Sequence, residues 1–181
     1  LEAFEKVTLK RPDFADAYYF LGYGYINLGL YVKAKLTWED YVRLSNDEEK
    51  KKEINERLSM LGEPVKIEEG YNMILSGKFQ EGIERLSQYT EGSYKDWWPL
   101  WYYLGTAYQA LEMFEEAVEK YLKVLQLSPS NLEAMEELVR CYEILGDAEK
   151  VEKYTKKIGV IKENMELDRL EKMKEKNIDF S

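Results

Sequence analysis

The sequence predicts an all-α protein built from antiparallel helix pairs that stack side by side, and three observations predict this class. Apolar residues recur at the spacing of one helix face, as in Tyr18, Leu21 and Tyr25. Residues 17–32 and 97–111 contain no charged side chain, so each predicts a helix that is covered on more than one side. The 45% hydrophobic and 34% charged residues are typical of a folded chain rather than a disordered one.

An internal repeat organises the chain. The same residue types return at the same intervals in several segments, and single glycines fall where the two helices of a unit would be joined by a tight turn. The turn glycines are Gly29, Gly77 and Gly146. The strongest copy contains Trp101, Leu104, Gly105, Tyr108, Ala117, Tyr121 and Pro129; a second contains Tyr18, Leu21, Gly22, Tyr25, Ala34 and Trp38; a third contains Met135, Leu138 and Tyr142; a weaker one contains Gly70, Met73, Gly82 and Leu86.

This pattern resembles the tetratricopeptide repeat, a helix–turn–helix unit of about 34 residues. The resemblance implies a right-handed superhelical α-solenoid of antiparallel helix pairs. The chain departs from the regular period between Gly29 and Gly77, where Ile54, Leu58 and Leu61 predict one extra inserted helix. We also expect a C-terminal capping helix, with Ile161, Met165 and Leu170 covering the last repeat.

We therefore expect a single array over residues 1–181. Its expected parts are a truncated repeat end at 1–14, a repeat at 15–46, the extra helix at 47–62, a divergent repeat at 63–97, repeats at 98–131 and 132–159, and the terminal helix at 160–181.

The resemblance implies that the first helix of each pair lines a concave groove in which ligands bind. Tyrosine offers a large contact area and a hydroxyl, which favours the groove as a binding site. Core packing is the alternative for each single tyrosine. Trp97, Trp98 and Pro99 form either an exposed contact patch or a cluster packed against the preceding repeat. The expected groove residues are Tyr19, Tyr23, Tyr71, Tyr102, Thr106, Gln109, Glu136, Arg140 and Glu143.

Composition argues against several kinds of catalytic and cofactor site. The chain has no histidine, so it lacks Ser-His-Asp and Cys-His triads and histidine metal sites, and Cys141 is its single cysteine. Gly22 and Gly24 lack the third glycine of a dinucleotide loop, and Ser76-Gly77-Lys78 lacks the upstream glycine of a phosphate loop. We interpret the carboxylate pairs Glu68/Glu69 and Glu115/Glu116 as solvated charges. We expect no catalytic residues, no metal and no cofactor.

The predicted function is that of a non-catalytic scaffold that binds a protein or peptide; a self-assembly or spacer module of a larger protein is the alternative. The net charge is −9, of which −8 falls in residues 62–146, so the partner should combine apolar anchors with some basic residues. We expect neither nucleic-acid binding nor membrane insertion. A lone cysteine favours the cytoplasm, unless the chain is a fragment of an exported protein.

Overall fold

The computed structural model describes the backbone of residues 1–178 and the side chains of residues 1–173, and every regular element within this part is an α-helix. The predicted all-α class is confirmed. The chain divides into two compact units, unit 1 over Leu1–Ser76 and unit 2 from Gly77 onward.

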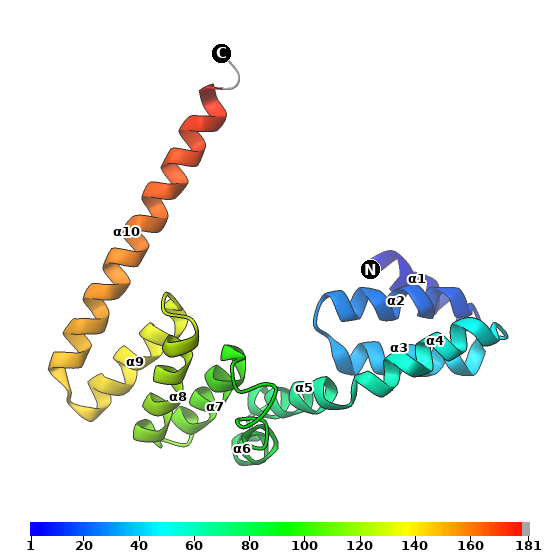
Figure 1. The fold of residues 1–181 in the computed structure, drawn as a ribbon, viewed down its shortest axis with the longest axis horizontal. Helices are drawn as coiled ribbons and strands as arrows, with labels where there is room; N and C mark the ends of the chain where they lie inside the picture. Colours follow the sequence, from blue (N-terminus) through cyan, green and yellow to red (C-terminus); the bar gives the residue numbers. More distant parts are fainter. Residues whose placement is uncertain (179–181) are drawn as a thin grey trace. The chain divides into compact units, whose positions relative to one another are not determined.

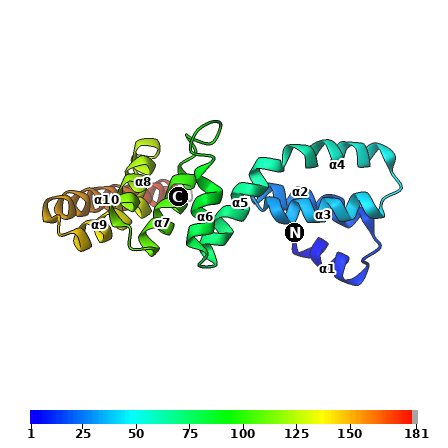
Figure 2. The same cartoon turned by 90° about the horizontal axis from the view of Figure 1, so that it is seen from below.

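Unit 1 contains an antiparallel helix pair with helices on either side of it (Figure 1). Figure 2 shows the inserted helix α4 running alongside this pair. The helices of unit 1 are α1 (Glu2–Lys10), α2 (Ala15–Asn27), α3 (Tyr31–Leu44), α4 (Glu48–Met60) and α5 (Gly62–Leu75).

Unit 2 contains two successive helix pairs, α7 with α8 and α9 with α10 (Figure 1). Residues between Ser87 and Trp98 form turns and bends, and Pro99 then occupies the first turn of α7, where its missing N–H costs no hydrogen bond. The helices of unit 2 are α6 (Phe79–Ser87), α7 (Trp98–Ala110), α8 (Phe114–Leu127), α9 (Leu132–Leu145) and α10 (Ala148–Ile178).

The glycines that were predicted at turns adopt the left-handed backbone conformation. Gly29, Gly77 and Gly146 all adopt positive φ angles, of 70°, 84° and 75°. In the turn between α7 and α8 the corresponding residue is Glu112, which adopts a φ of 60° despite its side chain. All four turns therefore contain one residue with a positive φ, although in one of them that residue is Glu112 and not a glycine.

Each unit is held together by large side chains that fit against a small residue on the facing helix. A Cβ atom added to Gly22 would overlap the indole of Trp38, and one added to Gly105 would lie 2.7 Å from Cε1 of Tyr121. Both aromatic side chains are almost completely buried. The close approach of α2 to α3 and of α7 to α8 therefore depends on the repeat glycines Gly22 and Gly105.

The C-terminal helix differs from its expected boundary. Residues 148–178 form one continuous helix, so no break separates the last repeat from the terminal helix. The physical reason is that residues 148–178 contain no proline and one glycine, Gly159, and a single glycine costs only about 1 kcal/mol. Of the three predicted covering residues, Ile161 packs on the core of unit 2, whereas Met165 and Leu170 are 59% and 43% exposed.

Candidate functional site

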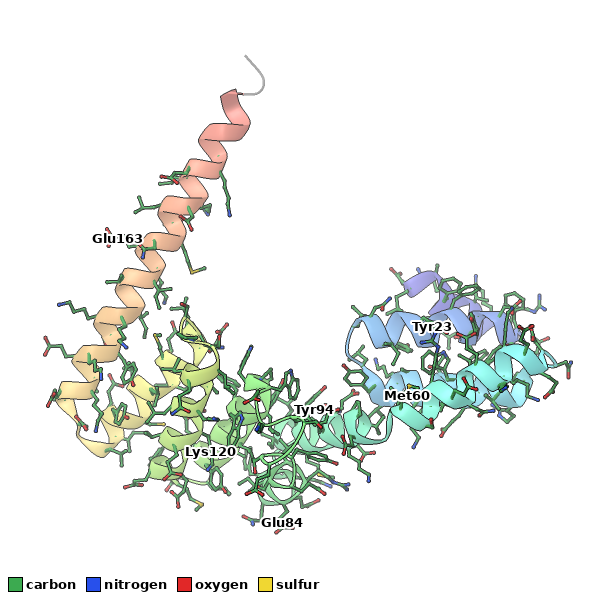
Figure 3. The ribbon with its side chains drawn as sticks, viewed as in Figure 1. Tyr23, Met60, Glu84, Tyr94, Lys120 and Glu163 are labelled. Carbon is green, nitrogen blue, oxygen red and sulfur yellow. The ribbon has the colours of Figure 1, made fainter. Side chains whose placement is uncertain are left out.

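The tyrosines of α2 converge on one carboxylate of the inserted helix α4. The Tyr19 hydroxyl donates to Oε2 of Glu53 at 3.1 Å, and the Tyr23 hydroxyl donates to Oε1 at 2.5 Å. The hydrogen bond from Tyr23 lowers the pKa of Glu53, while burial, followed by the same hydrogen bond, raises the pKa of Tyr23. The two predicted groove tyrosines are thus half-buried and engaged by α4; Tyr23 is labelled on α2 in Figure 3.

Two cations complete this contact from the same helix. The guanidinium of Arg57 lies 4.9 Å from the centre of the Tyr23 ring, and its Nε lies 3.1 Å from Oε1 of Glu53. The ammonium of Lys50 lies 5.4 Å from the centre of the Tyr19 ring. Unit 1 therefore holds an arginine by an aromatic ring and a carboxylate acting together.

The same tyrosines also touch the core of unit 1. The Tyr19 ring lies 5.3 Å from Tyr41, and the Tyr23 ring lies 5.0 Å from Trp38. Tyr71, on α5, is half-buried as well. The three predicted tyrosines of unit 1 are consequently neither fully buried nor fully exposed.

In unit 2, Tyr102 lies at the meeting of α7, α8 and α9. Its ring is 5.6 Å from that of Tyr121 and 6.4 Å from that of Trp98, which meets it edge-on. Burial raises the pKa of Tyr102, and the nearby carboxylates of Glu137 and Glu133 raise it further. Trp98 is 37% exposed and Glu133 is exposed as well, whereas the side chain of Glu137 is only 17% exposed.

A chain of hydrogen bonds joins the three helices beside Tyr102. The Tyr121 hydroxyl donates to Oε1 of Gln109 at 2.6 Å, and Nε2 of Gln109 donates to Oε2 of Glu137 at 2.9 Å. The other oxygen of Glu137 accepts from Arg140 at 2.6 Å. Gln109 therefore braces α7, α8 and α9. The name aromatic–acidic face is used below for Trp98, Tyr102, Glu133, Glu137 and Arg140.

The remaining predicted groove residues lie around this face or beyond it. The Thr106 hydroxyl donates to the backbone oxygen of Tyr102 at 3.0 Å, so it serves the helix itself. Glu136 pairs with Lys162 of α10 at 2.8 Å. Glu143 is exposed and lines a groove of about 610 Å³ between the end of α9 and the start of α10. The structure thus joins Gln109 and Arg140 in one hydrogen-bond network beside the Tyr102 ring and leaves Glu136 and Glu143 outside it.

Sequence reasoning missed the two carboxylates that organise these contacts, Glu53 and Glu137. The sequence carries a signal for the start of each of these helices, a capping side chain, but none for the carboxylates themselves. Asp47 caps α4 by accepting from the N–H of Lys50, and Asn131 caps α9 by accepting from the N–H of Ala134. Both carboxylates accept hydrogen bonds from the preceding helix pair, Glu53 from Tyr23 and Glu137 from Gln109.

The interpretation of Glu68 as a solvated charge is wrong. Its side chain is buried, with the residue only 4% exposed, and Oε2 accepts a hydrogen bond of 2.7 Å from the backbone N–H of Val32. Val32 lies in the first turn of α3, where unpaired N–H groups and the helix dipole favour a negative charge. Glu68 of α5 therefore caps α3 from a distant part of the sequence.

The single cysteine, Cys141, has no access to solvent. Its side chain is completely buried, and burial, followed by the charge of Glu137, raises its pKa to about 11. At neutral pH the thiol is therefore protonated and inaccessible. Among the side chains described up to residue 173, no three of His, Cys, Asp or Glu lie together as metal ligands would. No helix of the described chain is long and apolar enough to cross a membrane.

Comparisons with known proteins support the repeat and the fold. Residues 98–131 match the family model of the tetratricopeptide repeat, which confirms the predicted resemblance. A comparison with curated proteins gives no match. Helical repeats of this kind support a general role in protein–protein interaction.

Solved structures of MamA share the fold over most of the chain. One titled "Crystal structure of MamA" is 22% identical, with a TM-score of 0.52, over 91% of this chain and 87% of that chain. "MamA MSR-1 C2" is 18% identical, with a TM-score of 0.60, over 83% and 98%. "MamA RS-1 ArsTM double mutant" is 15% identical, with a TM-score of 0.56, over 90% and 83%. At these identities the similarity shows the fold alone.

Proposed function

We propose, on the premise that residues 98–131 form a tetratricopeptide repeat, that this chain is a non-catalytic scaffold that binds a segment of another protein on its aromatic–acidic face. The segment presents apolar anchors together with arginine or lysine. The buried, protonated thiol of Cys141 supports the non-catalytic part of the proposal, because a thiolate is the reactive form. A single cysteine also agrees with a cytoplasmic protein.

The observation that carries the proposal is the place of Tyr102 in the fold: it packs on the core of unit 2, and, besides burial, the charges of Glu137 and Glu133 on α9 raise its pKa. An arginine that reaches this place can lie against the ring face and pair with a carboxylate at the same time. Trp98, exposed and in edge-on contact with Tyr102, offers the neighbouring apolar surface. Tryptophan and tyrosine are the residue types that most often dominate binding energy at interfaces.

Unit 1 contains an internal example of the same chemistry. Arg57 lies over the Tyr23 ring and pairs with Glu53, so a ring and a carboxylate hold one guanidinium within this very chain. The Tyr102 ring and the carboxylates of Glu133 and Glu137 provide the same combination of groups. This likeness supports arginine as the preferred basic residue of the partner.

Arg140 is the internal competitor for such a ligand. It already pairs with Glu137, but its side chain is 61% exposed. The side chain of Glu137 is only 17% exposed, but the guanidinium of Arg140 reaches it from the solvent side, so an incoming arginine can take the same place. Removal of the Arg140 side chain should therefore strengthen binding rather than weaken it.

A peptide selection tests the proposal. Random peptides displayed on phage are selected on the full chain and then on the triple variant Tyr102→Ala, Glu133→Gln, Glu137→Gln, with Glu163→Gln as a control on the far part of α10 (Figure 3). We expect peptides enriched in arginine beside apolar residues, and retention that falls at least about tenfold on the triple variant.

The single variant Arg140→Ala should retain these peptides better than the unmodified chain. Circular dichroism verifies that each variant keeps its helix content. A selection that yields no arginine-containing peptides, or equal retention of the arginine peptides by the triple variant, would contradict the proposal.

A further inference from the structure

A second groove of unit 2 lies between α10 and the connection from α8 to α9. Its volume is about 500 Å³. The apolar side chains that line it are Pro129, Met135, Val160 and Ile161, and its charged side chains are Lys153, Lys156 and Lys157. The name lysine groove is used below for these seven residues.

The charge of the lysine groove is opposite to that of the chain. The whole chain has net charge −9, whereas residues 153–162 contain four lysines and no acidic residue. The ammonium groups of Lys153 and Lys157 lie 5.7 and 5.6 Å from the centre of the Tyr154 ring. The partner of both lysines in this contact is an aromatic ring and not a carboxylate. An acidic ligand would supply the missing opposite charge.

An exposed apolar stripe continues from the groove along α10. Val160, Leu167 and Leu170 are 51%, 53% and 43% exposed, and their spacings of seven and three residues place them on one side of the helix. Figure 1 shows that α10 extends well beyond α9. From Lys153 to Leu170 the groove and stripe measure about 26 Å along the helix axis, the length of a helix of about 18 residues.

We propose that the lysine groove and its stripe bind an acidic amphipathic helix of another protein. The apolar face of such a helix covers Val160 and the stripe, while its carboxylates pair with the lysines. This binding mode is independent of the aromatic–acidic face, which has the opposite charge and selects basic ligands. The two proposals can therefore succeed or fail separately.

The probe is a fluorescently labelled peptide of about 18 residues made of leucine and glutamate, with leucines at helical positions i, i+3, i+4 and i+7. Its binding to the full chain is measured by fluorescence anisotropy at about 0.15 M salt. A scrambled peptide of the same composition, a lysine-for-glutamate version and vesicles of phosphatidylserine and phosphatidylcholine are measured in parallel.

Two variants remove the two halves of the proposed surface. The triple variant Lys153→Glu, Lys156→Glu, Lys157→Glu reverses the charge of the groove, and Leu167→Asp interrupts the stripe. The matched control, Lys10→Glu, Lys52→Glu, Lys66→Glu, makes the same change of net charge at exposed lysines of unit 1. Light scattering and circular dichroism report the oligomeric state and helix content of every variant.

We expect saturable binding of the acidic helix, at least tenfold weaker binding to the groove triple variant and to Leu167→Asp, and unchanged binding to the control. The groove triple variant should instead bind the lysine version of the peptide. Equal binding of the scrambled peptide, equal loss in the control, or binding to vesicles without binding to the peptide would overturn the proposal. Dimers of the free chain that the groove variants abolish would also overturn it, because a second copy would then be the occupant.

Discussion

At the scale of single residues, two glycines decide how closely paired helices approach. Gly22 leaves room for the indole of Trp38, whose Nε1 donates to the backbone oxygen of Tyr19 at 3.2 Å, and Gly105 leaves room for the ring of Tyr121. Tyr121 in turn holds Gln109 through its hydroxyl. Gly105 therefore positions the Tyr121 ring in the core and, through Tyr121, the hydrogen bonds of Gln109 beside the aromatic–acidic face.

Gly105→Ala should destabilise the chain. The added methyl would lie 2.7 Å from the Tyr121 ring, and overpacking costs about 1–3 kcal/mol, against a gain of about 1 kcal/mol in helix propensity. We expect a net loss of about 1 kcal/mol in the free energy of unfolding, measured by urea denaturation.

Gly159→Ala is the matched control, because Gly159 lies within α10 with no atom near the position of an added methyl. The same substitution there should stabilise by about 0.5–1 kcal/mol. A Gly105→Ala chain that is as stable as the unmodified one would show that Tyr121 moves aside at no cost.

The repeat spacing predicted the turns at Gly29, Gly77 and Gly146, because a turn is a local feature that recurs with the repeat. The roles of Glu53, Glu68 and Glu137 could not be predicted in the same way. Each accepts hydrogen bonds from a helix far away in the sequence, and a single carboxylate in a charged stretch carries no periodic signal. The repeat therefore predicts which residues pack, whereas the polar contacts depend on the helices' final positions.

At the scale of helices, α3 depends on a cap that comes from α5. The carboxylate of Glu68 accepts a hydrogen bond from the backbone N–H of Val32 in the first turn of α3, and Glu68 itself is only 4% exposed. The connection between α3 and α5 is consequently polar as well as apolar, since Val65 of α5 packs in the same cluster as Trp38 and Tyr41.

Replacement of Glu68 should measure the cap. Glu68→Gln keeps an acceptor oxygen but removes the charge, so we expect a loss of about 1 kcal/mol in the free energy of unfolding. Glu68→Leu leaves the Val32 N–H without its acceptor and should cost about 2 kcal/mol. The exposed Glu56→Gln on α4 serves as the control and should change stability by less than about 0.5 kcal/mol. Equal stability of all three variants would contradict a capping role.

The helix boundaries show where the repeat pattern predicts well and where it does not. The inserted helix α4 lies within the residues expected for it, since its amphipathic spacing and the Asp47 cap are local signals. By contrast, α10 continues through residues 159 and 160, because the repeat period marks where a unit should end but supplies no residue that stops a helix. A period alone is thus a weaker predictor of a helix end than a capping residue or a proline.

At the scale of the molecule, the two proposed surfaces of unit 2 divide the charge between them. The aromatic–acidic face presents Glu133 and Glu137 from α9, and the lysine groove presents Lys153, Lys156 and Lys157 from α10. A scaffold with two surfaces of opposite charge can select two different partners, because each surface repels the ligand of the other. The net charge of −9 is a sum over the chain and therefore does not reveal the basic lysine groove.

The binding of an arginine by Tyr102 is the central claim, and a double-mutant cycle measures it most directly. An arginine peptide obtained by selection is titrated calorimetrically into the unmodified chain and into Tyr102→Ala, and the same two titrations are repeated with the arginine replaced by alanine. Tyr103→Ala, at the adjacent position of α7, is the control. We expect a coupling energy of about 1 kcal/mol or more between Tyr102 and the arginine, and close to zero for Tyr103. A coupling energy near zero for Tyr102 would contradict that claim.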